Sequence, residues 1–225
     1  MPTVALVGAD GAGKSTIARE VVRRLGDHGR YLYMGINLEA SNLMLPSTRL
    51  VLELKRRKGG RPDLAPPRIN GHAPVPGRRR SLANLKTDLR FANQIAEEWF
   101  RQLAAWYHLR RGMVVIFDRH FVWDYHASFT IPGSPHTSVI RKWHDELLRQ
   151  RYPRPDLVIC LDAPGDVLMR RKAGGTVEER ERRRREYLEI GAQTPGFTLV
   201  NVDRPQETVI QDVMTAISTF KEHSR

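Results

Sequence analysis

A glycine-rich stretch near the N-terminus has residue types and a spacing suited to holding phosphate. It reads Gly-Ala-Asp-Gly-Ala-Gly-Lys-Ser over residues 8–15 and matches the pattern G-x-x-x-x-G-K-[ST] in full. We call Gly8–Thr16 the phosphate loop. It follows a short apolar run and precedes an amphipathic one, so its backbone N–H groups can point at one phosphate from the start of a helix. The pattern predicts binding of a nucleoside triphosphate.

Within the phosphate loop, two side chains have distinct expected roles. Lys14 would reach the β- and γ-phosphates, and Ser15 would ligate Mg²⁺. The alternative is a chance glycine turn with a solvated lysine, which the full match and its flanking elements disfavour. The residues expected to bind the nucleotide are Gly8, Asp10, Gly11, Ala12, Gly13, Lys14, Ser15 and Thr16.

An acid and an arginine follow the apolar run Met113–Phe117. An acid at the carboxyl end of a buried strand lies at the sheet edge where doubly wound folds bind ligands. There Asp118 could hold Mg²⁺ through water or orient an acceptor hydroxyl, and Arg119 could pair with an anionic acceptor. The alternative is a helix cap beside a surface arginine. His120 and His126 could also suggest a metal pair, but the chain offers them no cysteine or further ligand at a metal-site spacing.

A third set of candidate residues is cationic. Arg170, Arg171 and Lys172 end a helical pattern just before Gly174 and Gly175. Cations before a flexible glycine pair are typical of a mobile lid that brings positive charge onto transferring phosphates, and we place this lid at about residues 170–185. The alternative is that the cations simply favour the negative C-terminal end of a helix.

These three elements, in this order and spacing, resemble the thymidylate kinase branch of the P-loop nucleoside monophosphate kinases. The resemblance covers about three quarters of the chain and leaves out roughly residues 35–82. The residues that carry it are Gly8, Asp10, Gly11, Gly13–Thr16, Asp118–His120, Pro155–Leu157, Leu161, Asp162, Tyr187–Glu189 and Val202–Pro205.

The resemblance implies a fold and an activity. It implies a P-loop NTPase fold, a three-layer α/β/α arrangement with a five-stranded parallel sheet and a lid, and Mg²⁺-dependent transfer of the γ-phosphoryl group of ATP to a nucleoside monophosphate. By that similarity Asp10 would touch the acceptor sugar, Arg119 its phosphate, and Asp118 the Mg²⁺ or the attacking oxygen. Because Gly11 stands where some members have arginine, the catalytic cations would come from the lid. The candidates are Arg170, Arg171 and Lys172, with Arg180 as a further one.

The acceptor half of the chain departs from the family pattern. On the acceptor helix, Gln94 stands where the family has arginine, and Phe91 is displaced from the base-stacking position. Trp123 occupies the family's serine position after Asp118 and Arg119. These differences predict that the base, if the acceptor has one, is held differently from thymine.

Strands and helices alternate along the chain, as an α/β domain with a parallel sheet requires. The apolar runs lack polar alternation, which favours strands buried on both faces. The expected strands are Thr3–Val7, Arg30–Met34, Met113–Phe117, Leu157–Leu161 and Thr198–Val202. Helical spacing is expected for Ile17, Val21 and Leu25, for a stripe of Leu85, Leu89, Ile95, Trp99, Leu103 and Trp106, and for Val209, Val213, Ile217 and Phe220. We expect the long stripe to be core rather than a stacking platform for bases.

A basic insertion at about residues 55–80 interrupts this single domain, which we place at 1–225. It holds nine Lys and Arg against Asp63, and five prolines between Gly59 and Gly77 make regular structure unexpected there. The whole chain has a formal net charge of +12. Such an excess favours anionic partners, namely nucleotides, nucleic acid or an acidic membrane surface, and the partner we expect is a nucleotide or another small anionic acceptor. Nucleic acid is a less favoured partner, through the insertion, because no aromatic residues interleave with its charges.

Composition narrows the class of protein further. The single cysteine, Cys160, excludes a disulfide scaffold and is expected to be a buried apolar residue. No apolar run reaches the roughly 20 residues that a membrane span needs, and Thr3–Val7 is too short for a signal peptide, so a cytoplasmic location is expected. The preferred function is a nucleoside monophosphate kinase. The alternatives are a kinase of a nucleoside or other small alcohol and a P-loop nucleic-acid-binding NTPase. A homodimer is compatible with each.

Overall fold

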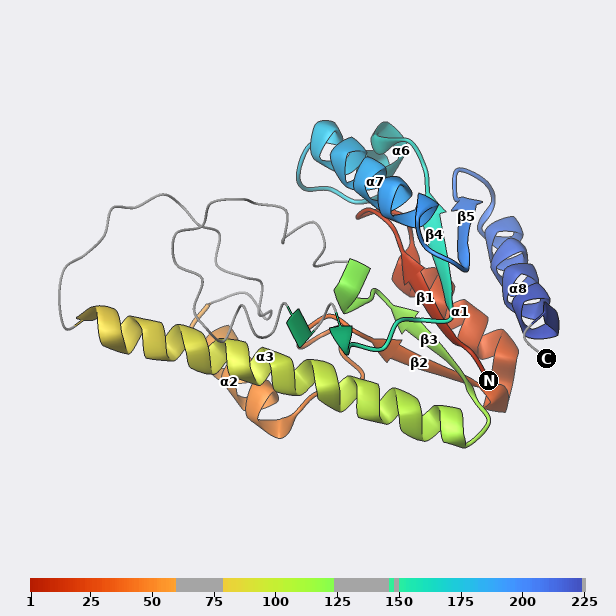
Figure 1. Ribbon diagram of the computed structural model, residues 1–225. Coiled ribbons are helices and arrows are strands. Elements are labelled where there is room, and N and C mark those ends of the chain that lie inside the picture. The colour runs from red at the N-terminus through yellow and green to blue at the C-terminus, as the bar shows by residue number, and fades with distance from the viewer. Residues whose placement is uncertain (60–78, 124–145, 148–149, 224–225) are drawn as a thin grey trace. The chain divides into compact units, whose positions relative to one another are not determined.

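The computed structural model describes residues 1–59, 79–123, 146–147 and 150–223, and it has a sheet of five parallel strands at its centre (Figure 1). The strand order is β2-β3-β1-β4-β5, so the first strand lies in the middle. The strands are β1 (Thr3–Val7), β2 (Gly29–Tyr33), β3 (Val114–Asp118), β4 (Leu157–Asp162) and β5 (Phe197–Asn201). All five strands predicted from apolar runs are confirmed, each within one residue at either end.

The sheet is buried because its strands are apolar on both faces. Every residue of β1, β3 and β4 is buried. Helices α1 (Lys14–Leu25) and α8 (Gln206–His223) pack on the sheet and on each other. Their buried side chains, Ile17, Val21 and Val213 among them, join the strands in one apolar core. Cys160 on β4 is buried, as predicted, with 2% of its surface exposed, and burial raises the pKa of its thiol to about 12.

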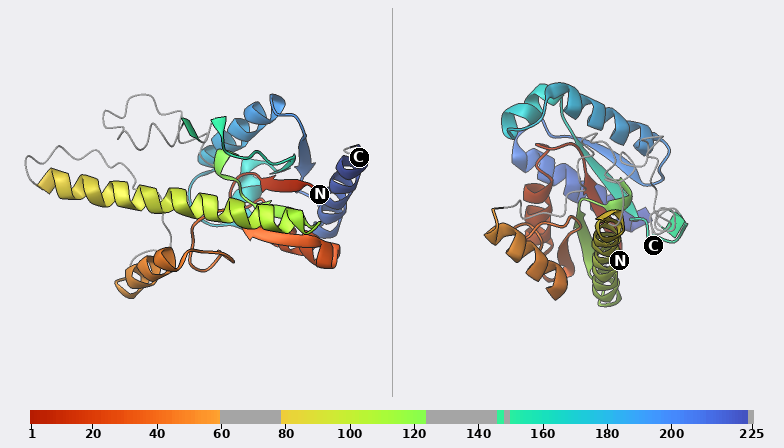
Figure 2. Two further views of the ribbon diagram at one scale, coloured as in Figure 1. Left: turned by 60° about the horizontal axis from the view of Figure 1, so that its bottom comes forward. Right: turned by 90° about the vertical axis from the view of Figure 1, so that its left-hand side faces the viewer.

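The described chain divides into two compact units, each taken here by itself. The first comprises the described parts of Met1–Gly35, Ala104–Pro132 and Pro153–Arg225, and it contains the whole sheet. Besides α1 and α8, it holds η1 (Gly26–His28), α6 (Gly165–Arg171) and α7 (Val177–Ala192). Helices α6 and α7 pack against each other, and both views of Figure 2 show them as a pair.

Helix α7 was not predicted from the sequence, because Arg and Glu dominate it and no apolar stripe marks it. Its start is fixed by a capping box instead: the Thr176 hydroxyl accepts from the Glu179 N–H, and the Glu179 side chain accepts from the Thr176 N–H. The sequence signal was therefore a pair of polar residues at the right spacing rather than a hydrophobic pattern.

The second unit comprises the described parts of Ile36–Leu103 and Gly133–Tyr152. It holds α2 (Pro46–Arg57) and most of α3 (Arg79–Arg110). Residues Lys55–Arg57 form the last turn of α2, and Arg79 and Arg80 begin α3, so both ends of the predicted basic insertion are helical. The expectation that Gly59–Gly77 lacks regular structure falls, after Gly59, outside the described residues.

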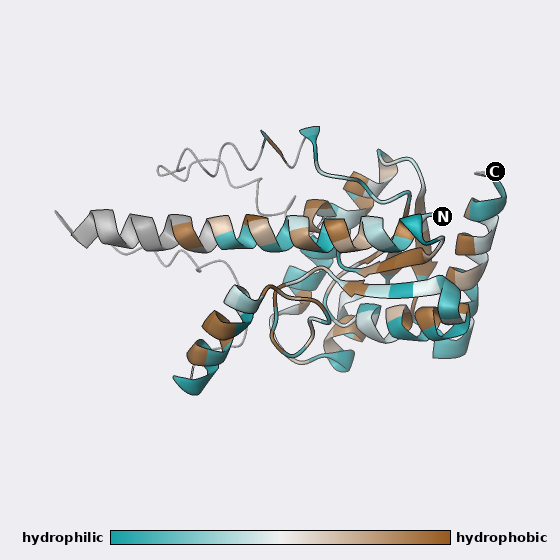
Figure 3. Ribbon diagram, turned by 90° about the horizontal axis from the view of Figure 1, so that it is seen from below, coloured by the Kyte–Doolittle hydropathy of each residue, from teal (hydrophilic) through white to brown (hydrophobic). Residues whose placement is uncertain are grey.

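The prediction that the apolar stripe of α3 is core is wrong for three of its six residues: Leu89, Leu103 and Trp106 are 70%, 61% and 52% exposed. Ile95 and Trp99 are half-buried, and the side chain of Leu85 lies outside the described part. Figure 3 shows hydrophilic and hydrophobic residues alternating along this helix. Among the α3 side chains that the structure describes, the buried ones are Glu97, Glu98, Arg101, Gln102 and Ala105.

Polar partners explain why α3 buries charge. The Glu97 carboxylate pairs with the Arg101 guanidinium at 2.7 Å and accepts from the Leu45 N–H at 2.8 Å, just before α2. Asn93 donates to the Thr48 hydroxyl at 2.7 Å. Buried charges are tolerated when they are paired in this way. No described helix is long and apolar enough to cross a membrane.

Candidate functional site

The phosphate loop folds tightly because two of its glycines occupy positions that no other residue fits. Gly8 has φ 138°, and a Cβ there would collide with the Leu161 carbonyl at the end of β4. Gly11 has φ 95°, and a Cβ there would collide with the Leu168 carbonyl of α6. The loop thus lies directly against β4 and α6, and the first turn of α1 begins at Lys14.

Lys14 is folded back over the loop that precedes it. Its Nζ donates to the Gly8 carbonyl at 2.8 Å and to the Ala9 carbonyl at 2.9 Å, and the residue is 6% exposed. The lysine charge is therefore held within the curl of the loop, at the positive end of the α1 dipole. A phosphate bound between the loop and the helix would lie beside this charge.

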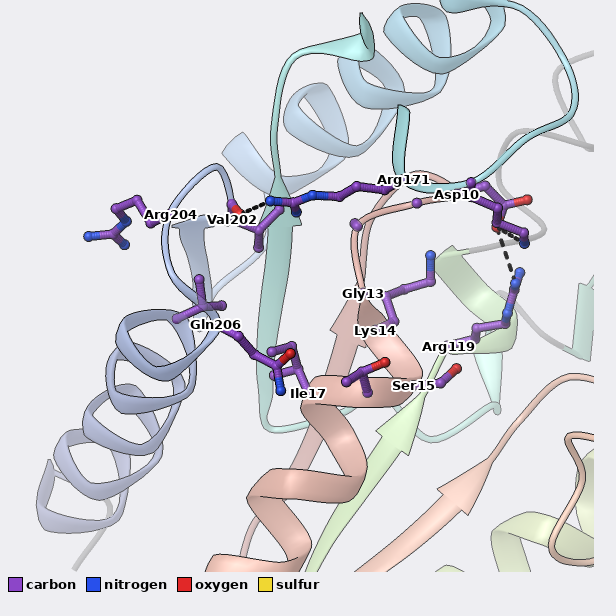
Figure 4. Close-up of a pocket in the computed structure, with 15 residues that line it drawn as sticks. Asp10, Gly13, Lys14, Ser15, Ile17, Arg119, Arg171, Val202, Arg204 and Gln206 are labelled. Atoms are coloured by element: carbon purple, nitrogen blue, oxygen red, sulfur yellow. Dashed lines mark hydrogen bonds and ion pairs between the residues drawn. The ribbon is translucent and has the colours of Figure 1, made fainter. Parts of the chain in front are cut away.

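A cavity of about 490 Å³ opens at this loop, within the first unit (Figure 4). It is lined by Asp10, Gly11, Ala12, Gly13, Lys14, Ser15, Thr16, Ile17, Arg119, Arg171, Lys172, Val202, Arg204, Gln206 and Val209. Five of these residues are cationic and one is acidic, so the lining carries a formal charge of +4. All the predicted nucleotide-binding residues except Gly8 line it, and so do Arg119 and Arg171.

Asp10 joins two of these cations at the tip of the loop. Its Oδ1 lies 3.3 Å from an Arg119 nitrogen and 3.4 Å from the Lys172 Nζ. Burial alone would raise the pKa of this carboxyl, but the charges of Lys14, Arg119 and Lys172 outweigh burial and lower it. Asp10 is consequently an anion that an incoming phosphate would have to displace from Arg119 and Lys172.

Arg119 has the backbone conformation of a residue held in place by its neighbours. Its φ is 73°, the left-handed region that L-residues rarely adopt, and its N–H donates to the Leu6 carbonyl of β1 at 3.2 Å. Non-glycine residues in this conformation are concentrated at functional sites, where the fold offsets the strain. The conformation directs Arg119 toward Asp10 rather than along the strand direction of β3.

Asp118 is wholly buried at the end of β3 and does not line the cavity. Its Oδ2 accepts a hydrogen bond from the Tyr31 hydroxyl at 2.7 Å. Its Oδ1 is buried and has no hydrogen-bond partner among the described residues. Burial, followed by the Asp118 charge, raises the pKa of Tyr31, so this hydroxyl stays protonated and donates.

These residues fit the Mg²⁺ that the sequence predicts. Ser15 offers a hydroxyl on the cavity wall, and Asp118 offers a buried carboxylate oxygen that lacks a partner. Hard divalent cations take oxygen ligands, and Mg²⁺ usually keeps several waters. Among the residues described, no three His, Cys, Asp or Glu gather into a protein-only metal site. His120 is buried against Phe117, and His126 lies outside the described residues.

The predicted lid cations are divided between cavity and solvent. Arg170 does not line the cavity: its side chain is 69% exposed and pairs with Asp166 one turn earlier on α6. Arg171 crosses from α6 to donate to the Val202 carbonyl at 2.9 Å, as Figure 4 shows. Its guanidinium therefore lies beside the β5–α8 connection, whereas the Lys172 ammonium lies beside the Asp10 carboxylate of the phosphate loop.

Arg180, a further candidate for a catalytic lid cation, is buried among main-chain carbonyls. It is 5% exposed, and its guanidinium donates to the carbonyls of Asp10, Lys172 and Gly174, each at 2.6 Å. The guanidinium that was a candidate for binding phosphate is thus hydrogen-bonded to three main-chain carbonyls. Arg180 therefore ties the phosphate loop to the α6–α7 connection.

A second arginine of α7 has a similar role, which the sequence did not suggest. Arg184 donates from two nitrogens to the two oxygens of Asp162, at 2.7 and 2.9 Å, at the end of β4. Two parallel hydrogen bonds of this kind fix orientation as well as distance. We call Gly165–Ala192 the α6–α7 segment. Arg180 and Arg184 anchor this segment to the sheet edge that carries the phosphate loop.

Comparison of the chain with protein-family models and with curated proteins gives no match. The chemistry of the site is therefore inferred from its own residues and their geometry.

Proposed function

We propose that this protein is a P-loop NTPase-fold phosphotransferase that moves the γ-phosphoryl group of ATP to a nucleoside monophosphate, in the manner of the thymidylate kinase branch. One observation carries the proposal. The loop of Gly8–Thr16 curls around Lys14 and opens into a cavity whose lining carries a formal charge of +4. A site of this size and charge suits the phosphates of one nucleotide.

The donor phosphates would bind between the phosphate loop and the first turn of α1. The backbone N–H groups there carry the positive end of the helix dipole, and Lys14 adds a full charge. When bound, Mg²⁺ would neutralise negative charge that develops on the transferring phosphates. Ser15 would hold it directly. Asp118 would hold it through water, since Asp118 does not line the cavity.

The acceptor would be recognised by its negative charge. Arg119 lies opposite Asp10, and a guanidinium matches a phosphate with two parallel hydrogen bonds. A phosphate would replace the Asp10 carboxylate as the partner of Arg119, leaving Asp10 to accept from an acceptor hydroxyl. A neutral alcohol offers no anion for this exchange. The site therefore favours a monophosphate over its nucleoside.

The test is an ADP-release assay with nucleoside monophosphates, nucleosides and simple alcohols as acceptors. Wild type is expected to prefer a monophosphate over the matching nucleoside. In Arg119→Ala this preference should shrink by about 10- to 100-fold, the worth of a hydrogen bond to a charged group.

Arg23→Ala is the matched control, because this arginine is exposed on the last turn of α1 and pairs only with Glu20 among the described residues. It should behave as wild type. A better rate with the uncharged nucleoside in wild type would replace the proposal with a nucleoside or alcohol kinase. ATP binding without ADP release for any small acceptor would favour a P-loop protein of another class.

A further inference from the structure

The two oxygens of the Asp118 carboxylate have unlike surroundings. Oδ2 accepts from the Tyr31 hydroxyl at 2.7 Å, whereas Oδ1 is buried and has no hydrogen-bond partner in the part of the chain that the structure describes. The residue as a whole is 0% exposed. Leaving a buried charged oxygen without a partner is costly, so its presence calls for a group that completes it.

Tyr31 is itself firmly placed. It lies on β2, which pairs in parallel with β3 in a register that sets Tyr31 opposite Ile116 and Tyr33 opposite Asp118. The Arg19 guanidinium of α1 stands over the Tyr31 ring, 5.6 Å from its centroid. A cation over an aromatic face stabilises the ring in that position. The hydroxyl therefore reaches Asp118 from a ring held by both its strand and a neighbouring helix.

We propose that Tyr31 is a positioning residue for Mg²⁺: its hydroxyl holds Oδ2 of Asp118 and so leaves Oδ1 as the oxygen available to the water through which Asp118 would hold the ion. This inference rests on the proposed function. A carboxylate that is hydrogen-bonded on its other oxygen cannot rotate freely, and loss of an outer partner of a metal site typically weakens metal affinity by about 10- to 100-fold. Tyr31 makes no contact with the phosphates in this scheme and acts only through Asp118.

The experiment compares Tyr31→Phe with wild type, because this substitution removes the hydroxyl and keeps the ring. Mn²⁺, which is paramagnetic and replaces Mg²⁺, is titrated by electron paramagnetic resonance in the presence of a non-hydrolysable ATP analogue. The protein-dependent affinity for Mn²⁺ should fall by about 10-fold or more in Tyr31→Phe. Affinity for the analogue without metal should change by less than about twofold.

Tyr33→Phe is the matched control, since it removes a hydroxyl two residues further along the same strand, one that does not bond Asp118. It should bind Mn²⁺ as wild type does. A double-variant cycle with Asp118 tests whether Tyr31 acts on Mn²⁺ affinity through Asp118 or only by supporting the fold. In an Asp118→Asn background, Tyr31→Phe should cause no further loss of Mn²⁺ affinity.

The outcomes separate this inference from the proposed function. If wild type with the analogue binds Mn²⁺ no better than the analogue alone, the magnesium site and the proposed function both fail. If wild type binds Mn²⁺ and Tyr31→Phe binds it equally well, only the role of Tyr31 is overturned. An equal loss of affinity with and without Asp118 would also overturn it, because Tyr31 would then act by another route.

Discussion

The phosphate loop and the α6–α7 segment both place cations at or beside the cavity, and they hold them in different ways. In the phosphate loop, Lys14 bonds carbonyls only five and six residues earlier in the chain. In the α6–α7 segment, Arg171 bonds a carbonyl 31 residues away, and Arg180 bonds one 170 residues away. The first arrangement is made by a local turn. The second exists only once the sheet and its helices have assembled.

This difference bears on function because local and long-range arrangements respond differently to ligands. A loop that encloses its own lysine is ready for phosphate before the nucleotide arrives, which lowers the cost of binding. The α6–α7 segment is held by hydrogen bonds from Arg171, Arg180 and Arg184 to distant residues, and Val167 and Leu168 also pack in the apolar core. Arg171 and Lys172 of this segment line the cavity, so a bound phosphate would attract their charges. We therefore expect the phosphate loop to set binding and the α6–α7 segment to respond to it.

The largest expected effect on the reaction rate is that of Lys14, the cation held by local contacts in the phosphate loop. Lys14→Ala should lower the rate of phosphoryl transfer by about 10²- to 10³-fold, because a preorganised positive charge on the phosphates is lost. Initial-rate measurements of ADP release with saturating acceptor give this number. Lys221→Ala, on the last turn of α8, is the control and should keep the wild-type rate. Turnover near wild type in Lys14→Ala would remove the phosphate loop from the mechanism.

An intermediate effect is expected for the long-range tether. Arg180→Gln cannot reach all three carbonyls that Arg180 bonds, so the free energy of unfolding should fall by about 1–3 kcal/mol. The α6–α7 connection should also open, and trypsin should cut after Lys172 faster than in wild type. Urea unfolding and timed proteolysis measure the two effects separately.

The control for Arg180→Gln lies on the same helix. Arg182 is 65% exposed and pairs with Glu186, so Arg182→Gln should change the stability by less than about 0.5 kcal/mol. Equal cleavage rates in wild type and Arg180→Gln would show that the segment is held by contacts other than this tether.

The same contrast explains which parts of the molecule were predictable. The residues of the phosphate loop could be predicted because the signal is local. Its glycines permit the positive φ angles of the turn, their spacing from Lys14 and Ser15 matches a known pattern, and a strand and a helix flank the loop. The five strands were predictable because burial on both faces leaves an unbroken apolar run. Arg180 and Arg184 looked like free cations, since nothing local shows that their partners are carbonyls of Asp10 and Lys172 and the carboxylate of Asp162.

Helix α3 shows a second reason why a prediction from sequence can be wrong. Its apolar spacing was genuine, yet the residues it buries are Glu97 and Arg101, which pair with each other, and Glu97 also takes the Leu45 N–H before α2. Periodicity assumes that the apolar face is the buried one. A buried ion pair reverses this assumption, and its partner outside the helix cannot be read from spacing. Tyr31 was not predicted as a site residue for the same reason: its hydrogen bond to Asp118 joins two strands that are far apart in the sequence.

The smallest expected effect concerns Asp10, whose carboxylate links the phosphate loop to Lys172 of the α6–α7 segment and to Arg119 after β3. Its side chain is 52% exposed, so these ion pairs are screened by solvent and should contribute less than about 1 kcal/mol. Asp10→Asn should therefore lower the free energy of unfolding slightly at pH 7. Urea unfolding of both proteins at a series of pH values measures the difference.

The pH dependence of that small difference shows whether charge is its cause. Burial would raise the pKa of Asp10, but Lys14, Arg119 and Lys172 lower it below its ordinary value of 3.8 in the folded protein. A lowered folded-state pKa adds stability that is complete above the unfolded-state pKa and is lost as the pH falls through the folded-state pKa. The advantage of wild type over Asp10→Asn should thus be constant from about pH 5 to 7 and shrink below about pH 4. The contacts of Lys14 with carbonyls have no acid to titrate and should persist over this range. An advantage that stays constant down to pH 3 would mean that the ionisation of Asp10 is not the cause of the difference in stability.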